Sequence, residues 1–179
     1  MPEDPSSGNQ ISEPQLHRAP GQILMRTEAT ASLCVGRTVC FPSCVSLVTD
    51  AYSRKIVGHH VHESLHTESG IKALEKAVGE RETEQGLIHY SDRGAQLRPV
   101  SRLHTKHGIR CSMTDGSDCY QNAMAERVNG ILKTEFLLRC PKNLADAVKM
   151  VDESVLIYNE ERPHLALKYN TPDAVHRAF

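Results

Sequence analysis

Two acidic residues stand where the sequence could bring them to a common site. Asp92 follows the apolar run Leu87–Tyr90, directly after Ser91. A short apolar run of this kind is typical of a buried parallel strand, and the carboxyl ends of such strands carry the sites of α/β proteins. Taken alone, Asp92 is explained at least as well as a turn residue that accepts hydrogen bonds from backbone N–H groups.

Glu126 belongs to a segment that we predict to be a helix from Asn122 to about Leu138. Apolar side chains gather on one face of this helix: Met124, Val128, Ile131 and Leu132. A separate polar stripe has the spacing i, i+3, i+4 and i+7: Glu126, Asn129, Gly130 and Lys133. Gly130 costs the helix ~1 kcal/mol relative to alanine, which suggests that something large approaches it closely. An ordinary solvated helix face would also explain the stripe.

The net charge of −1 does not indicate a nucleic-acid partner, but the charges are distributed unevenly along the chain. Between Arg93 and Arg110 there are five basic residues and no acidic residue. Such a cluster could contact phosphates, which attract Lys and Arg whatever the base sequence. A solvated helix face is the simpler interpretation of this cluster by itself.

Other features of the composition exclude whole classes of protein. The chain contains no run of 18 apolar residues, so we expect no membrane span, and its N-terminus lacks the pattern of a signal peptide. We therefore expect a cytoplasmic protein. The six cysteines form no CxxC pair, which argues against a zinc site. Residues 1–22 are polar and rich in proline, and we expect them to form a disordered leader.

The elements that must position the acidic residues follow from hydrophobic periodicity. We predict two strands joined by the turn 51–55, followed by two single strands. These strands are Cys44–Thr49, Ile56–His62, Leu87–Tyr90 and Ile109–Met113. Besides the helix that carries Glu126, we predict helices starting at Thr67, running from near Pro99 to Gly108, and running from Leu144 to just before Pro163. This order of elements indicates a mixed α/β fold.

Five segments together are far more specific than any one of them. In chain order they are VTDAYSRKIVG (48–58), IHYSDRG (88–94), QNAMAE (121–126), LKTE (132–135) and YNEERPH (158–164). The series resembles the integrase-like core of OrfB-type insertion-sequence transposases, which are DDE enzymes of the retroviral-integrase superfamily. The resemblance runs from about residue 24 to residue 179.

The resemblance implies a ribonuclease-H-like α/β fold, with a five-stranded mixed sheet flanked by helices. It divides the chain into the disordered leader (1–22), an integrase-like catalytic core (23–140), and a C-terminal helix and tail that complete the core (141–179). The implied function is phosphoryl transfer on DNA, by strand cleavage and strand transfer, in transposition, DNA integration and DNA recombination.

The resemblance also implies which residues carry the chemistry. Three carboxylates would hold two Mg²⁺ ions, with Mn²⁺ as a substitute, at the positions of Glu28, Asp92 and Glu126. Hard cations prefer oxygen ligands, and two of them ~4 Å apart can stabilise both the attacking and the leaving oxygen of an in-line displacement. Side chains expected at the DNA are Lys133, Arg93 and Asn129.

The sequence departs from the family pattern in two places. The family has Thr-Asp-Ile-Thr on its first strand, whereas the best match here is Thr27-Glu28-Ala29-Thr30. Asp50 is an intact acid nearby, but it matches a position that is not catalytic in the family. After Asp92, the segment 97–102 also departs from the family, and the interval to Glu126 is shorter than usual. Both departures have sharp edges, which suggests local disruption of the reading frame.

Three functions therefore compete. The leading one is a DNA strand-transfer enzyme, intact or damaged. The second is a non-catalytic transposase remnant that folds and binds DNA or a transposase subunit. The third, a cellular ribonuclease-H-like nuclease, fits the C-terminal motif YNEERPH less well.

We expect the partners to be the ends of an insertion element and its target DNA. We also expect a homo-oligomer on DNA, a separate helix-turn-helix subunit for end recognition, association with the nucleoid, and no contact with a membrane.

Overall fold

The computed structural model describes residues 23–30, 43–64, 67–80, 86–91, 97–113 and 126–178. Five strands form one sheet in the order β3-β2-β1-β4-β5. Their bounds are β1 Ile23–Thr30, β2 Cys44–Asp50, β3 Ile56–His62, β4 Leu87–Ser91 and β5 Arg110–Met113. The pairs β1–β2 and β2–β3 are antiparallel, whereas β1–β4 and β4–β5 are parallel.

The helices lie between and after the strands. They are α1 Thr67–Gly79, α2 Leu97–Lys106, α4 Leu144–Glu160 and α5 Pro172–Arg177, with a short 3-10 helix, η2, at Leu165–Leu167. Residues 126–131 are α-helical and lead directly into a π-helical turn, η1, at Leu132–Phe136. No helix among these described residues is long and apolar enough to cross a membrane.

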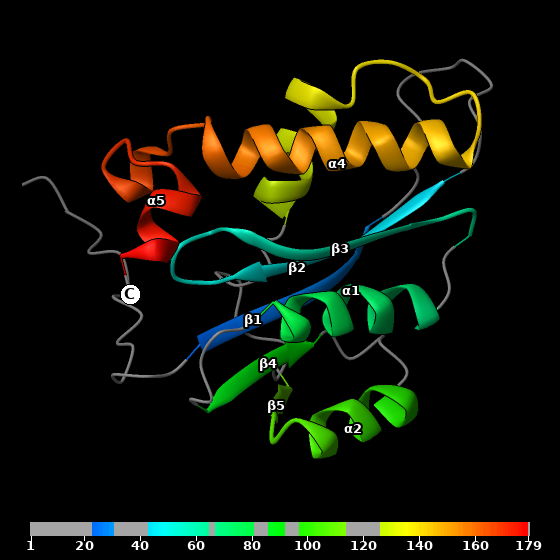
Figure 1. Ribbon diagram of the computed structural model, residues 1–179, viewed down its shortest axis with the longest axis vertical. Coiled ribbons are helices and arrows are strands. Elements are labelled where there is room, and N and C mark those ends of the chain that lie inside the picture. Colours follow the sequence, from blue (N-terminus) through cyan, green and yellow to red (C-terminus); the bar gives the residue numbers. More distant parts are fainter. Residues whose placement is uncertain are drawn as a thin grey trace, which may run out of the picture.

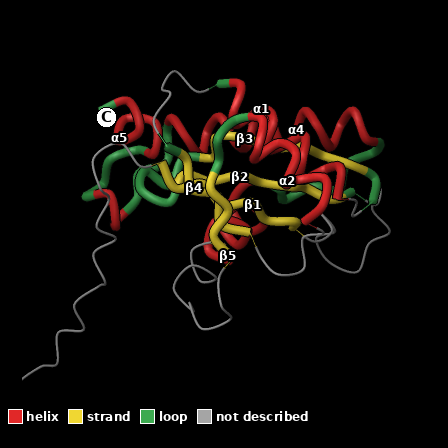
Figure 2. Tube along the Cα trace, turned by 90° about the horizontal axis from the view of Figure 1, so that it is seen from below, coloured by secondary structure: helices red, strands yellow, loops and turns green. Residues whose placement is uncertain are grey.

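The sheet is covered on both faces, and each face has its own apolar cluster (Figure 1). On one face, α1 and α2 contribute Leu74 and Leu103 to a cluster with Val48 of β2. On the other face, the 126–136 segment and α4 contribute Leu132 and Val151, among others, to a second cluster. Figure 2 shows the same strands, in yellow, with red helices packed around them. The segment that carries Glu126 therefore shares a face of the sheet with α4.

Close packing of α1 on the sheet depends on Gly58 in β3. A Cβ atom at this position would stand 2.2 Å from the carbonyl oxygen of Ala73 and 2.8 Å from the Cβ of Ala77. Only glycine allows the helix backbone to come so near to the strand. The last residue of the VTDAYSRKIVG motif thus has a packing role.

Most element boundaries agree with the sequence predictions. β3 has the predicted bounds, α1 begins at Thr67, and α4 begins at Leu144 and ends before Pro163. The side chain of Asn143 caps α4 by accepting a hydrogen bond from the N–H of Asp146 at 2.8 Å. At the end of α2, Gly108 has φ +62° and the N–H of Ile109 donates to the carbonyl of His104, as in a Schellman motif.

The helix α2 spans Leu97–Lys106 rather than starting near Pro99 and ending at Gly108, and two further elements differ more from the predictions. The predicted α-helix from Asn122 to about Leu138 changes to a π-helical turn at Leu132, because the N–H of Leu137 donates to the carbonyl five residues earlier. This turn inserts one residue, so that Leu132 and Leu137 both reach the core. The second difference is α5, which the periodicity did not predict because it is only six residues long. Its start signal is present in the sequence, since Thr171 is a capping residue and Pro172 occupies the first turn.

Candidate active site

The register of the sheet fixes the backbone position of Glu28. In β1, Glu28 is paired with Leu47 of β2, and Leu47 belongs to the apolar cluster on the α4 face. The neighbouring residue Thr27 is paired with Ser91, the last residue of β4. Since β1 and β4 are parallel, their carboxyl ends lie at the same edge of the sheet.

Three predicted positions lie outside the described residues or are described only in part. Asp92 and Arg93 follow β4 and lie outside the described residues, as does the leader, residues 1–22. Of Glu28, the structure describes the backbone. The approach of Asp92 to Glu126 therefore stays a prediction.

Glu126 stands at the start of the described helical segment, and its side chain is exposed. It has neither a hydrogen bond nor an ion pair with any residue of the described part of the chain. Two residues on, Val128 is buried, and Leu132 follows it into the same cluster. Val128 and Leu132 of the predicted apolar face are therefore buried, and Glu126 of the predicted polar stripe is exposed.

Asn129 and Lys133 lie on the polar stripe and are half-buried. Both line a small pocket between the helix and the sheet, together with Val45 and Leu47 of β2. Leu47 is the β2 residue opposite Glu28. The polar stripe therefore runs beside the strand pair that contains Glu28. At Gly130, an added Cβ would meet nothing within 4 Å, so packing within the described protein does not explain this glycine.

The side chains proposed for the site are of the type that binds a hard cation. Glu28, Asp92 and Glu126 would offer only carboxylate oxygens, which are the preferred ligands of Mg²⁺. The carboxylate of Glu126 is exposed and has no ion pair with another described residue, so it is accessible to a cation. Among the described residues, which exclude position 92, no group of three His, Cys, Asp or Glu side chains is close enough to hold a metal ion.

Asp50 has a structural role at the β2–β3 turn. It is 1% exposed and accepts hydrogen bonds from the N–H and the hydroxyl of Ser53. His176 of α5 lies 3.3 Å from the same carboxylate. Burial alone would raise the pKa of Asp50, but the hydrogen bonds from His176 and Ser53 bring it below its usual value. Asp50 thus belongs to the turn, as the family resemblance implied.

The C-terminal segment is attached to the same hairpin by two further contacts. The side-chain amide of Asn159 bonds both the N–H and the carbonyl of Ile56, at 2.9 Å each. Lys55 forms an ion pair of 2.7 Å with Asp173 of α5. In Figure 1, α5 lies beside the loop between β2 and β3. The VTDAYSRKIVG and YNEERPH motifs are therefore in contact with each other, and these contacts are structural.

The YNEERPH motif also contacts the segment that carries Lys133. The guanidinium of Arg162 donates two hydrogen bonds of 2.7 Å to the carboxylate of Glu135, one from Nε and one from a terminal nitrogen. The ring of His164 packs edge-on against that of Tyr158, with ring centroids 4.9 Å apart. Burial raises the pKa of the Tyr158 hydroxyl to about 12, so this group stays neutral.

The histidines have structural partners. His89 of β4 and His104 of α2 lie 2.8 Å apart between ring nitrogens, on the α1–α2 side of the sheet. Burial, and then the neighbouring His104, lower the pKa of His89 to about 4. In β3, His59 contacts Asp152 of α4 at 2.6 Å. Both pairs join a strand to a helix.

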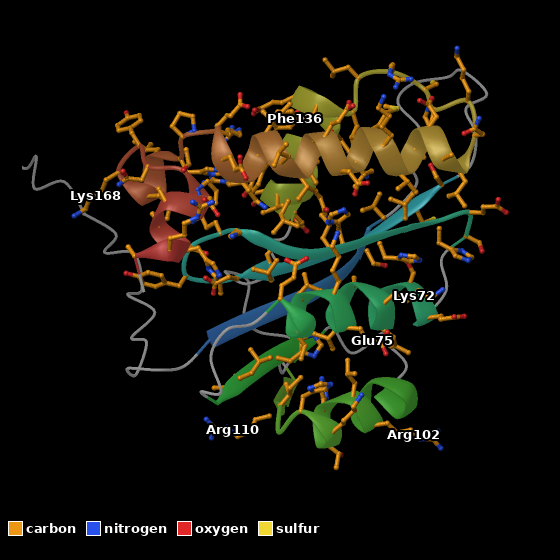
Figure 3. All side chains as sticks on the ribbon, in the orientation of Figure 1. Lys72, Glu75, Arg102, Arg110, Phe136 and Lys168 are labelled. Atoms are coloured by element: carbon orange, nitrogen blue, oxygen red, sulfur yellow. The ribbon has the colours of Figure 1, made fainter. Side chains whose placement is uncertain are left out.

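The basic cluster predicted between Arg93 and Arg110 is only partly described. Arg102 lies on α2 and Arg110 on β5, whereas Phe136 lies at the end of η1 (Figure 3). Since α2 packs on the face opposite to the 126–136 segment, Arg102 is not on the face that carries Lys133. Because α2 packs onto α1, Arg102 and Lys133 lie on opposite faces of the sheet. The distance between them in the sequence does not predict this separation.

Sequence reasoning named Glu135, Asn159 and Arg162 only as parts of motifs and gave them no role. Their contacts join positions 27 to 103 residues apart, and no local pattern predicts such pairs. The signal present in the sequence was the position of these polar residues within the motifs LKTE and YNEERPH. Glu135 is an acidic residue and Arg162 a basic residue, each in a motif and without an assigned function. An ion pair between them was therefore a reasonable hypothesis.

Comparison with protein families identifies an integrase core domain over most of the chain. One family model with the description "Integrase core domain" matches residues 27–119, and a second with the same description matches residues 107–172. The first match includes the positions of Glu28 and Asp92, and the second includes Glu126 and Lys133.

Relatives from insertion elements match the chain in sequence. A transposase for insertion sequence element IS629 of Shigella sonnei is 32% identical over 140 residues, which are 75% of this chain and 46% of that protein. A 31 kDa protein of IS600, also from Shigella sonnei, is 32% identical over 136 residues, covering 74% and 50%. A protein of IS986/IS6110 from Mycobacterium tuberculosis is 36% identical over 100 residues, covering 52% and 36%. The chain thus spans half or less of the length of these relatives.

Solved structures with the same fold are integrase catalytic cores. The catalytic core domain of BIV integrase has a TM-score of 0.63 at 12% identity, with coverage of 87% of this chain and 93% of that chain. The HTLV-2 integrase catalytic core domain in complex with magnesium, in a dimeric form, has a TM-score of 0.63 at 16% identity, with coverage of 86% and 94%. The predicted ribonuclease-H-like fold class is confirmed.

Proposed function

Since the chain belongs to the integrase core domain family, we propose that it is the catalytic core of an insertion-sequence transposase, acting by metal-dependent phosphoryl transfer on DNA. The family implies DNA binding and dependence on a divalent metal. The specific claims of the proposal are the residues, the two ions and the reaction.

The observation that supports the proposal best is the register between β1 and β4. Its last pair is Thr27 with Ser91, and a further step along both parallel strands would lead to Glu28 and Asp92. Opposite partners in a sheet belong to the same face, and Glu28 is paired with Leu47 on the α4 face. That face is also covered by the segment that begins with Glu126.

In this proposal, Glu28, Asp92 and Glu126 hold two Mg²⁺ ions, for which Mn²⁺ can substitute. When bound, the ions would activate the attacking oxygen and stabilise the leaving oxygen. The protein contributes three carboxylates on two adjacent strand ends and one helix. The exposure of Glu126 leaves its oxygens accessible to a cation and to DNA.

Lys133 and Asn129 would bind DNA next to the carboxylates, with Arg93 directly after Asp92. Lys133 follows Glu126 by seven residues and stands in the π-helical turn that continues the same helix, where it lines one small pocket together with Asn129. A lysine at this place would neutralise a phosphate without reading its base.

The wider assembly is part of the same proposal. We expect at least two copies of the chain on paired element ends, with a separate helix-turn-helix subunit that recognises them. The HTLV-2 integrase core has a dimeric form, which is compatible with a homo-oligomer here. We expect the protein to act in the cytoplasm, associated with the nucleoid.

The second candidate function is a non-catalytic remnant that binds DNA or a transposase subunit. The observation in its favour is Glu28, which stands where the family has aspartate. Its carboxylate is one methylene further from the backbone, about 1.5 Å. Metal sites tolerate errors of ~0.5 Å, so this residue decides between the two functions.

Metal binding tests the proposed carboxylates independently of activity. Titration of the chain with Mn²⁺, followed by calorimetry, should show binding that weakens in Asp92→Asn and in Glu126→Gln. Glu153→Gln is the matched control, because Glu153 is an exposed acid on α4 outside the proposed site. Equal Mn²⁺ affinity in all four proteins would contradict the assignment of Asp92 and Glu126.

A further inference from the structure

We propose that Arg162 is a positioning residue for Lys133, because its contact with Glu135 fixes the π-helical turn on which Lys133 stands. The inference rests on the proposed function, in which Lys133 contacts a DNA phosphate. It assigns to the YNEERPH motif a role at the DNA-binding stripe, which lies on a different element.

The turn that carries Lys133 is a π-helical segment that begins with Leu132 and is followed by Leu137. The N–H of Leu137 donates a hydrogen bond of 2.8 Å to the carbonyl of Leu132 at its end, and Lys133 lies inside the turn. Leu132 and Leu137 anchor the two ends of the turn in the core. The π-helix is a rare conformation that occurs mostly as single turns, frequently at functional sites. A contact from another element can help to keep this rare conformation in one geometry.

Arg162, two residues after the end of α4, provides such a contact. Its two hydrogen bonds of 2.7 Å reach both oxygens of Glu135, which is the geometry in which arginine recognises a carboxylate best. The hydrogen bonding from Arg162 lowers the pKa of Glu135, so the pair is ionised at neutral pH. Their side chains are 24% and 43% exposed. Because such exposed pairs add little to global stability, the contact acts locally.

Arg162 is itself attached to the core. Its backbone N–H donates to the carbonyl of Ile157 at the end of α4, and Pro163 follows it. On its other side, a guanidinium nitrogen lies 3.5 Å from Nδ1 of His164. Burial, and then repulsion by Arg162, lower the pKa of His164 to about 4. A neutral His164 can accept from Arg162, and its ring packs on Tyr158, which is 0% exposed.

These contacts form a path from the buried end of α4 to the turn. It leads from Tyr158 through His164 and Arg162 to Glu135, two residues after Lys133. The alternative is that Arg162 contacts DNA directly. The two roles differ in one respect: a positioning residue has no effect on DNA affinity once Lys133 is removed, whereas a direct contact does.

Hydrogen exchange and DNA binding together test the proposal on the full chain. Arg162→Ala should make exchange in the peptide 132–138 roughly fivefold faster, since an exposed pair of this kind contributes up to a factor of that size. Binding to a generic DNA duplex should weaken by a similar factor. Arg162→Lys should behave like Arg162→Ala, because lysine keeps the charge but cannot form both bonds. Arg139→Ala is the matched control, since Arg139 also donates two bonds, of 2.9 Å each, to Asp146.

The combination of Lys133→Ala with Arg162→Ala decides between the roles. Positioning predicts that the double variant binds DNA as Lys133→Ala does. Additive losses of affinity, or unchanged exchange in Arg162→Ala, or equal acceleration in Arg139→Ala, would overturn the proposal. If the unmodified chain does not bind DNA, the proposed function fails, and with it the role of Lys133. The exchange data then decide separately whether Arg162 holds the turn.

Discussion

The side-chain amide of Asn159 in α4 replaces a missing backbone partner for Ile56 in β3, with two hydrogen bonds of 2.9 Å. β3 is an edge strand in the described part of the sheet, so its outer backbone groups have no neighbouring strand there. Asn159 is 8% exposed, and these bonds are made in a nearly dry environment. The contact attaches the C-terminal helix to the hairpin next to the site.

Asn159→Ala should therefore destabilise the protein by about 2–4 kcal/mol, because it leaves a buried N–H and a buried carbonyl without partners. Urea denaturation measures the loss. Asn170→Ala is the control, since Asn170 donates one hydrogen bond at an exposed position. Equal losses in both variants would mean that the amide of Asn159 is not a specific support of β3.

Gly58→Ala should destabilise the protein by roughly 1–3 kcal/mol, because the new Cβ has no room beside Ala73 and Ala77. Thermal unfolding measures this loss. At Gly79, the end of α1, an added Cβ meets nothing within 4 Å. Gly79→Ala should thus be neutral or stabilising, and a loss as large as that of Gly58→Ala would contradict the packing argument.

Gly130→Ala should separate the two explanations for the glycine in the polar stripe. Because nothing lies within 4 Å, alanine should stabilise the helix by up to ~1 kcal/mol. If DNA approaches this position, the same variant should bind a DNA duplex more weakly. Unfolding and binding measured on one preparation give both values. Improved stability with unchanged DNA affinity would leave the glycine as a harmless surface residue.

Stability should fall as the pH falls from about 6.5 to about 4. The pKa of His89 is lowered from 6.5 to about 4 in the folded protein, so between these values the unfolded chain binds a proton that the folded chain does not. Unfolding is then favoured by up to ~1.4 kcal/mol per pH unit for this group, and the effect ends below the folded pKa. Denaturation at several pH values should show a shallower slope for His89→Gln. An unchanged slope would show that His89 does not titrate in this range.

The sequence predicted well those elements whose pattern is local. The apolar residues of α4 repeat with a helical period, and α1 begins at Thr67, where a helix start is predicted. The π-helical turn was not predictable, because its extra residue becomes visible only when Leu132 and Leu137 are both buried. Patterns along the chain also cannot reveal which face of the sheet a charge such as Arg102 will lie on.

The candidate site was predictable in a similar way. The motifs identified Glu126, Asn129 and Lys133 as one stripe, and the structure has them on one helix beside β2. The support of this stripe by Arg162 depends on a contact across 27 residues, which needs the tertiary fold. Glu28 could be aligned with a family aspartate from the sequence. That its backbone lies next to the end of β4 follows only from the register between β1 and β4.

The central claim is that Glu28, Asp92 and Glu126 form one metal-binding site for DNA cleavage, weakened by the glutamate. The most direct measurement is strand cleavage of element-end DNA with Mg²⁺, comparing the unmodified chain, Glu28→Asp, and Glu28→Asp combined with Asp92→Asn. A misplacement of ~1 Å can cost about 100-fold in rate, so Glu28→Asp should cleave about 100-fold faster than the unmodified chain. Asp92→Asn should abolish this gain. Equal cleavage by the unmodified chain and Glu28→Asp, or cleavage that survives Asp92→Asn, would contradict the claim.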